Sequence, residues 1–391
     1  MTKTTSTTFR IGAMIGALML APGALAQESS DAFSVEGRYV VDAVATVAGG
    51  DDRGVRVLHE ADIALTADLE ALAGWSGVEA GVQLLAADGK RPNDIAGTLQ
   101  GIDNIEVEEA ELRIYQFWIG KRWDGDRFAV RAGLLDLNAD FYANDPAGLL
   151  IAPAFGIGSE LAATGPNGPS IFPQTAWTLF ASAGLGENGY VQGAVVNAHS
   201  GILGHDSDFG LSTREGALLI AEAGVRTHGK IAIGYWRYTN RQPDIRETVD
   251  REHIAQGVYL LLDRTVSGAP DGDGNGVDLF ARAGLSEGDT TPFRGGFQFG
   301  MLARGVFAGR PDSQFSVGFN TGLLSNGYRA ALATSGIASA DREDGIEITY
   351  ADRILPFLIV QPDMQYVRRA FAEDGDRDVW VLGLRLIAEL P

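Results

Sequence analysis

Residues 55–69 read VRVLHEADIALTADL, and this stretch decides the fold. Its odd-numbered positions are apolar from Val55 to Leu69, with His59 as the exception. Charged residues stand at even positions, among them Arg56, Glu60, Asp62 and Asp68. A period of two indicates a β-strand, because successive side chains of a strand point to opposite faces. One apolar face and one charged face place this strand between two different media.

The same alternation recurs along the chain. In residues 33–47, Val35, Tyr39 and Val41 alternate with Arg38 and Asp42. Fourteen further segments are predicted as strands: 76–86, 104–119, 126–135, 174–183, 188–197, 212–225, 228–238, 251–265, 276–286, 293–308, 312–321, 343–352, 355–368 and 377–389. An even number of strands, each about ten residues long, is typical of barrels that span the bacterial outer membrane.

The links between these segments mostly alternate between long and short. Outer-membrane barrels have longer links on the outside and tight turns on the periplasmic side. Aromatic residues at the predicted strand ends suggest the girdles of such a barrel: Tyr115, Trp118, Trp123, Tyr235, Trp236 and Tyr238. The sequence therefore predicts an all-β fold, a 16-stranded antiparallel transmembrane β-barrel. A large soluble β-sandwich is the alternative.

The first 26 residues have the features of a secretory signal peptide. Lys3 and Arg10 are positive, residues 11–20 are apolar, and APGALA ends in a small-residue cleavage site at Ala26. We expect residues 1–26 to be removed and residues 27–391 to form one barrel in the cell outer membrane.

Composition excludes several classes of function. The chain has no cysteine, which excludes thiol chemistry and cysteine-ligated metals. Its formal net charge of −20 disfavours nucleic acid as a partner. The histidines show no metal-ligand spacing, so we expect neither a metal site nor a cofactor.

The predicted link at 136–173 is the longest, and residues 141–158 within it read FYANDPAGLLIAPAFGIG. Pro146, Gly148 and Pro153 exclude a regular helix, yet the stretch is too apolar for an ordinary exposed loop. In a wide barrel such a loop can fold back and pack on the inner wall. We therefore predict a constriction loop in the lumen.

Several stretches resemble the carbohydrate-selective porin family (OprB type), in the order in which the family has them. They are RGVRVLHEADIALTADLEALAGWSG (53–77), LQGIDNIEV (99–107), RIYQFW (113–118), RAGLLDLNADFYANDPAGLLIAPAFGIG (131–158), DLFARAGLSEGD (278–289) and LIVQPDMQYV (358–367). This resemblance implies a sixteen-stranded outer-membrane barrel that passes sugars by diffusion.

Alternation also predicts which side chains line the lumen. Leu112, Ile114 and Trp118 are assigned to the lipid side, which leaves Glu111, Arg113, Tyr115 and Phe117 inside. Arg131 is assigned to the lumen of the next strand, and a turn near residue 123 would place it opposite Tyr115. By the same parity, Glu79 and Gln83 face inward.

Sugar recognition needs hydrogen-bonding groups together with an apolar face for the ring. The predicted binding residues at the constriction are Glu79, Gln83, Glu111, Arg113, Tyr115, Arg131, Asp136, Asn138, Asp140 and Asn144. The alternative is that the charged groups pair and fix the loop to the wall, since short polar residues such as Asp136, Asn138 and Asp140 commonly stabilise turns.

The predicted function is passive, carbohydrate-selective diffusion of small saccharides, without catalysis. A general diffusion porin is the main alternative, and an outer-membrane hydrolase or a plugged structural barrel are others. The expected partners are small saccharides, outer-membrane lipid, lipopolysaccharide and the barrel-assembly machinery. A homo-oligomer is compatible with the sequence.

Overall fold

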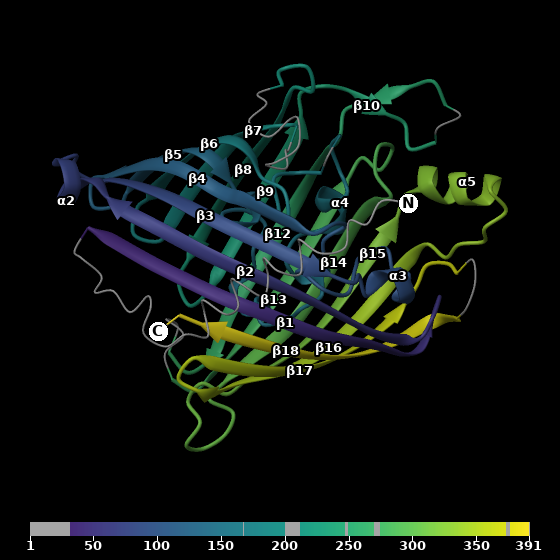
Figure 1. Ribbon diagram of the computed structural model, residues 1–391. Coiled ribbons are helices and arrows are strands. Elements are labelled where there is room, and N and C mark those ends of the chain that lie inside the picture. The colour runs from purple at the N-terminus through teal and green to yellow at the C-terminus, as the bar shows by residue number, and fades with distance from the viewer. Residues whose placement is uncertain are drawn as a thin grey trace, which may run out of the picture.

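A computed structural model describes residues 32–166, 168–199, 212–246, 249–269, 274–372 and 376–390. These residues form a closed antiparallel barrel (Figure 1). Its strands are β1 (Phe33–Gly50), β2 (Gly54–Asp68), β3 (Val78–Gly89), β4 (Glu111–Trp123), β5 (Phe128–Leu135), β6 (Ala176–Leu185), β7 (Gly189–Asn197), β8 (Ala217–Arg226), β9 (Lys230–Tyr238), β12 (Gln256–Ser267), β13 (Gly276–Ser286), β14 (Phe293–Arg304), β15 (Gln314–Leu324), β16 (Arg342–Leu355), β17 (Leu358–Arg368) and β18 (Asp376–Glu389). β1 pairs with both β2 and β18, which closes the sheet.

The sixteen-stranded fold predicted from the alternation is confirmed, and each predicted segment overlaps one strand of the barrel. The largest error in a boundary concerns residues 104–119. β4 begins at Glu111, and residues 90–110 leave the wall and enter the lumen. The predicted signal peptide lies outside the described residues.

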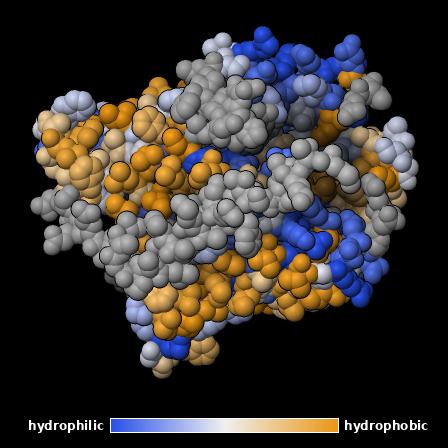
Figure 2. Space-filling model, in the orientation of Figure 1, coloured by the Kyte–Doolittle hydropathy of each residue, from blue (hydrophilic) through white to orange (hydrophobic). Residues whose placement is uncertain are grey.

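Alternation separates an outer apolar face from an inner polar one. On β2, Val55, Val57 and Leu65 are exposed on the outside of the barrel, whereas Glu60 and Asp62 are buried inside it. Figure 2 shows hydrophobic side chains over much of the visible outer wall and hydrophilic ones gathered toward one end. An apolar outer band with a polar interior is the arrangement that a lipid bilayer requires of a barrel.

The two ends of the barrel differ. The end that we call the turn end carries β1's first residues, β18's last residues and short links such as 186–188, 227–229 and 356–357. The opposite end, which we call the loop end, carries the long links 90–110, 136–175 and 325–341 (Figure 1). Long links at one end and tight turns at the other were predicted and are confirmed.

The turn between β4 and β5 corrects one predicted pairing. Asp124, Gly125 and Asp126 all have positive φ, and the turn that they form is centred beyond Trp123. β4 consequently extends past residue 119 to Trp123, and Arg131 lies opposite Gly120 rather than opposite Tyr115.

A β-bulge in β4 corrects the predicted orientation of Phe117 and Trp118. Gln83 pairs with Gln116 and Leu84 with Ile114, so Tyr115 is the extra residue. A one-residue insertion reverses the parity beyond it. Phe117 is therefore exposed on the outside, whereas Trp118 packs on the buried cluster inside the barrel.

The aromatic residues assigned to a girdle are also divided by the structure. Tyr115, Trp236 and Tyr238 are buried within the barrel, and Trp118 joins the same interior cluster. Trp123 and Tyr235 are exposed on the outer surface. Most of these rings thus fill the lumen and do not mark the membrane surface.

The links carry short helices. They are α2 (Leu69–Ala73), α3 (Asn93–Ala96), α4 (Ser159–Ala162), α5 (Asn326–Thr334) and the 3-10 turns η1 (Leu137–Ala139), η2 (Asp145–Ala147) and η3 (Pro153–Phe155). Strands β10 (Gln242–Pro243) and β11 (Glu252–His253) pair in the link that follows β9. Among the described helices, none is long and apolar enough to cross a membrane.

Candidate functional site

The 136–175 link folds into the barrel as a sequence of tight turns. Pro146 and Pro153 each lie in the first turn of a 3-10 helix, where a missing N–H costs nothing. Phe141 and Tyr142 bury their rings in a large interior cluster against the wall from β6 to β12. Phe155 packs edge-on to Phe280 of β13, at 6.3 Å between ring centroids. The apolar character of this link is thereby explained, since its side chains lie against the inner wall.

Two charged residues of the wall hold the backbone of this loop. The carboxylate of Glu347 on β16 accepts hydrogen bonds from the N–H groups of Ile151 and Ala152. The guanidinium of Arg282 on β13 donates to the carbonyls of Tyr142, Ala154 and Gly156. Both side chains are buried, and the hydrogen bonds that the charged guanidinium of Arg282 donates are of the stronger kind.

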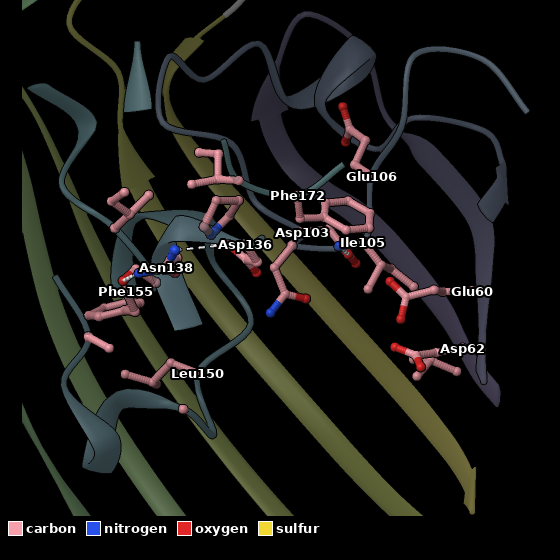
Figure 3. Close-up of a pocket in the computed structure, with 18 of the residues that line it drawn as sticks. Glu60, Asp62, Asp103, Ile105, Glu106, Asp136, Asn138, Leu150, Phe155 and Phe172 are labelled. Carbon is pink, nitrogen blue, oxygen red and sulfur yellow. Dashed lines mark hydrogen bonds between the residues drawn. The ribbon is translucent and has the colours of Figure 1, made fainter. Parts of the chain in front are cut away.

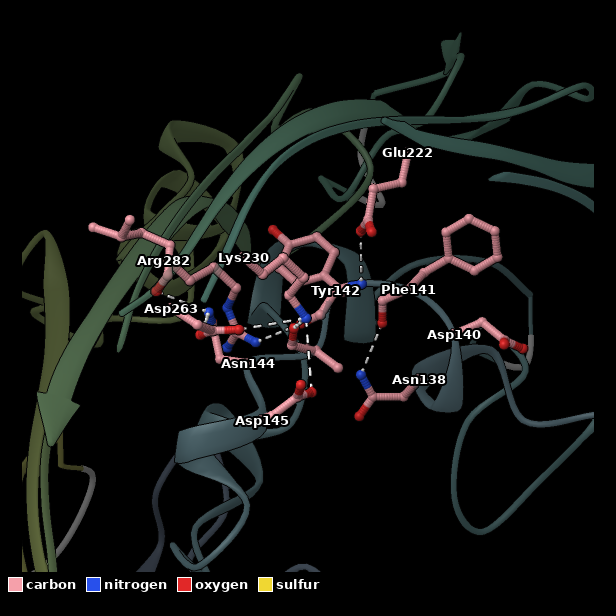
Figure 4. A network of polar contacts seen from close by, with 12 residues as sticks. Asn138, Asp140, Phe141, Tyr142, Asn144, Asp145, Glu222, Lys230, Asp263 and Arg282 are labelled. Carbon is pink, nitrogen blue, oxygen red and sulfur yellow. Dashed lines mark hydrogen bonds and ion pairs between the residues drawn. The ribbon is translucent and has the colours of Figure 1, made fainter. Parts of the chain in front are cut away.

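A network of polar contacts fixes the part of the loop that faces β8 to β13 (Figure 4). Asn144 donates to the carboxylate of Asp263 at 2.6 Å, and Lys230 lies between the carboxylates of Asp145 and Asp263. Further toward β8, the carboxylate of Glu222 accepts from the N–H of Tyr142 at 3.4 Å. Loop residues therefore contact strands far from β5 and β6, between which the loop is inserted.

The 90–110 link is a second segment inside the lumen, which the sequence analysis did not predict. Glu343 of β16 accepts from the N–H groups of Leu99 and Gln100, four residues before the glutamate that holds the larger loop. Ile102 and Ile105 pack in a buried cluster with residues of β1, β17 and β18. The two segments meet where Ser159 donates to the side chain of Gln100 at 3.0 Å.

A cavity of about 600 Å³ remains between the 136–175 loop and the wall formed by β18 and β1 to β4 (Figure 3). Glu60 and Asp62 lie on one side of it, and Leu150 and Phe155 lie across from them on the loop. Asp103, Ile105 and Glu106 enter from the second segment. The open part of the lumen is therefore bounded by one wall of strands and two inserted segments.

The strand side of the cavity is a connected polar surface. The guanidinium of Arg38 lies 3.0 Å from the carboxylate of Glu60 and 3.8 Å from that of Asp62. Gln83 donates to Asp62 at 2.6 Å and accepts from Gln116 at 2.6 Å. These side chains present both donors and acceptors to a solute in the cavity.

The loop side is largely apolar. Leu150, Phe155, Ile157 and Phe172 line the cavity from the 136–175 loop, and Ile105 adds an aliphatic side chain from the other segment. No group of three or more acidic or histidine side chains with the geometry of a metal site occurs among the described residues. The arrangement is suited to binding a solute by hydrogen bonds on one side and apolar contact on the other.

Half of the predicted site residues line this cavity. Tyr115 donates to Asp136 at 2.8 Å, and Asn138 donates to the carbonyls of Phe141 and Gly156. The predicted residues that the cavity brings together are Gln83, Tyr115, Asp136, Asn138 and Asn144. Asp136 also accepts from the N–H of Asn138, so it stabilises the turn at the start of the loop. Their role in sugar binding stays a prediction.

The other five predicted residues lie elsewhere and make structural contacts. Glu79 pairs with Arg122 at the turn end, at 2.9 Å. Arg131 pairs with Asp140 and lies 4.8 Å from the ring centroid of Phe180. A third pair is formed by Glu111 and Arg113, and Arg113 also donates to the carbonyl of Pro173. The alternative that charges fix the loop to the wall describes the contacts of Arg131 with Asp140 and of Arg113 with Pro173, but not the other two pairs.

Several residues that line the cavity are not among the predicted site residues. Arg38, Glu60 and Asp62 stood on the charged faces of the first two predicted strands, so their inward direction could be predicted. Asn104 and Arg385 hydrogen-bond to each other at 2.7 Å and lie in segments far apart in the sequence. What the sequence did not indicate is that the loop leaves open the space beside β18, β1 and β2.

Asp136 is the candidate residue with the clearest dependence on pH. Burial raises its pKa from the ordinary value of 3.8 to about 6, although Tyr115 and the N–H of Asn138 favour the ionised form. Because the folded pKa exceeds the unfolded one, the native state binds the proton more tightly. The stability that protonated Asp136 contributes is complete below about pH 4 and is lost as pH rises through 6.

We therefore expect Asp136→Asn to stabilise the barrel at pH 8 and to leave it nearly unchanged at pH 4. The gain should be no more than about 3 kcal/mol, because two pKa units set the limit and cavity water reduces it. The measurement is the urea midpoint of both proteins in detergent between pH 4 and 8. A difference between the midpoints that does not grow with pH would contradict the assignment.

Comparison with known proteins agrees with this fold. The profile of the family described as "Carbohydrate-selective porin, OprB family" matches residues 52–389. Porin B of Pseudomonas aeruginosa is 21% identical over 392 aligned positions, which cover 89% of this chain and 85% of that protein.

Solved structures share the fold. The high-pH structure of Pseudomonas putida OprB superposes with a TM-score of 0.80 at 20% identity, covering 92% of this chain and 94% of that one. OmpF of Salmonella typhi gives a TM-score of 0.60 at 9% identity, covering 91% of this chain and 97% of that one.

Proposed function

Because the chain belongs to the carbohydrate-selective porin, OprB family, and forms an outer-membrane barrel for sugar-selective diffusion, we propose that small saccharides cross it through the cavity beside the 136–175 loop. The narrowest part of the route is proposed to lie between this loop and the wall of β18 and β1 to β4. Lipid and lipopolysaccharide are expected to contact the apolar outer band, and the barrel-assembly machinery is expected to insert it.

One observation carries the proposal, namely that a polar wall faces an apolar one across a cavity of suitable size. Arg38, Glu60 and Gln83 offer donors and acceptors for sugar hydroxyls, whereas Leu150 and Phe172 offer surfaces for C–H groups. A volume of about 600 Å³ is in the range of pockets that hold small ligands. A saccharide loses hydrogen bonds to water when it enters such a space, and it can replace them only on the polar side of the cavity. Binding should consequently be weak, which permits release and passage.

The strand side is already hydrogen-bonded to itself in the absence of solute. Gln83 lies between Asp62 and Gln116, and Arg38 lies between Glu60 and Asp62. These contacts hold the side chains in place, so that a passing hydroxyl meets groups of fixed orientation. No energy source is needed, since the net direction of movement follows the concentration gradient.

Single-channel conductance in a planar bilayer, with glucose added in steps, tests the proposal. We expect current that falls saturably with sugar, and we expect Gln83→Leu and Phe172→Ala to raise the half-blocking concentration about fivefold, since one hydrogen bond or ring contact contributes about 1 kcal/mol. Both substitutions leave the charge of the cavity unchanged. Glu79→Gln is the matched control, because Glu79 lies outside the cavity, and it should leave the block unchanged.

Other outcomes would assign a different function. Current that sugars reduce only through viscosity would identify a general diffusion porin. A folded barrel without current would indicate a plugged lumen, and would contradict the proposed route.

A further inference from the structure

Carboxylates outnumber guanidinium groups in the lining of the cavity as a whole. The carboxylates are those of Glu60, Asp62, Asp103, Glu106, Asp136 and Asp145, and the guanidinium groups are those of Arg38 and Arg385. The guanidinium of Arg38 pairs with two carboxylates, those of Glu60 at 3.0 Å and Asp62 at 3.8 Å. The guanidinium of Arg385 likewise pairs with two carboxylates, those of Asp42 at 2.6 Å and Asp103 at 3.5 Å. The two guanidinium groups therefore contact four carboxylates, three on strands and that of Asp103 on the 90–110 segment.

The loop side adds negative charge and does not offset it. Asp136 receives hydrogen bonds from Tyr115 and from the N–H of Asn138, both uncharged donors. Asp145 has a side chain that is 88% exposed, and it shares Lys230 with Asp263. Among the described residues that line the cavity, Arg38 and Arg385 are the ones with a positive charge.

Asp103 gives a second and independent indication. The residue is only 3% exposed, and it lines the cavity from the 90–110 segment (Figure 3). Its Oδ1 accepts from the N–H of Ile105, whereas Oδ2 receives no donor from the described residues. A buried carboxylate oxygen without a donor is costly, and the nearby charge of Asp42 increases that cost. The positive field of a cation in the cavity would lower this cost.

We propose that the passage selects cations over anions, and that it therefore admits neutral and cationic saccharides while it excludes anionic ones such as uronates and sugar phosphates. This inference concerns the same route as the proposed function. Its physical basis is the field of an excess of carboxylates in a narrow space with low-dielectric walls, which attracts cations and repels anions.

The preference of the passage for cations over anions should decrease at acid pH. Burial and the charge of Asp42 raise the pKa of Asp103. Burial also raises the pKa of Glu106, although the nearby guanidinium of Arg91 acts in the opposite direction. The groups that face Asp103 are Asp42 on β1, Asp363 on β17 and Arg385 on β18. Measurements at pH 8 keep more of these carboxylates ionised than measurements at lower pH.

The test is the reversal potential of the intact barrel in a planar bilayer at pH 8, under a tenfold gradient of potassium chloride without sugar. An excess of one or two negative charges should favour potassium over chloride by about three- to tenfold at 0.1 M salt. Under a gradient of potassium glucuronate, the potential should approach the limit for potassium alone. Glu60→Gln and Asp103→Asn should each reduce the ratio at least about twofold.

Variants that remove a negative charge and a variant that removes a positive charge should change the ion preference in opposite directions. A folding defect would not do so. Arg38→Gln should raise the preference for potassium, whereas Glu79→Gln, which lies outside the cavity, should leave it unchanged. A permeability ratio of one or below, or a ratio unaffected by all three cavity substitutions, would overturn the inference. Block of the current by sugar is measured in a separate experiment. If the proposed function holds, that block should persist even when the passage shows no preference for cations.

Discussion

Glu347→Ala is expected to widen the channel and to abolish saturable block by sugar. Glu347 is buried and accepts from two consecutive N–H groups of the 136–175 loop, Ile151 and Ala152. Removing it leaves two buried donors without an acceptor, at a cost of about 1–3 kcal/mol each. The segment beside Leu150 should leave the wall to hydrate them, and the apolar side of the cavity would be lost with it.

Single-channel recording measures the effect. We expect conductance to rise about twofold or more, since the loop occupies much of the lumen beside the cavity. Glu347→Gln retains one carbonyl acceptor and should give an intermediate value. Asp344→Asn is the matched control, because Asp344 is on the same strand but pairs with Arg342 away from the loop. Unchanged conductance in Glu347→Ala would show that apolar packing alone holds the loop.

The barrel could be predicted because its determinants are local. The alternation of Val55, Val57 and Leu65 with Glu60 and Asp62 depends on the two media that a wall separates, and it recurs in most strands of the barrel. The 136–175 loop could be predicted for a similar reason, since apolar residues interrupted by prolines must find a surface to cover.

The site was predicted less well because its determinants are distant in sequence. The bulge at Tyr115 adds a single residue and so reverses parity without an obvious break in composition. The turn at Asp124 to Asp126 shifts the partner of Arg131 by several residues. Contacts such as Glu347 with Ile151 join segments almost two hundred residues apart, and one sequence contains no indication of them. These contacts decide on which side of the loop the cavity remains.

Arg282 is the second residue whose loss should have a large effect. Its guanidinium lies within the wall of β13 and donates to three carbonyls of the loop and to Gln298 at 2.9 Å. It also lies 5.0 Å from the ring centroid of Tyr142. A planar group with five donors can serve several acceptors at once, which an ammonium group cannot do from one position.

We expect Arg282→Met to destabilise the folded barrel by about 3–5 kcal/mol, because buried carbonyls lose a charged donor, and to expose the loop to proteases. Arg282→Lys should recover only part of the loss. The measurements are the urea midpoint in detergent and the rate of cleavage within residues 140–160. Arg264→Met is the control, since Arg264 is exposed on β12, and it should behave as the native chain does. Arg282→Met could instead be as stable and as resistant to proteases as the native chain. The interior cluster around Phe141 and Tyr142 would then be sufficient to hold the loop, and Arg282 would have to be assigned a role in conduction.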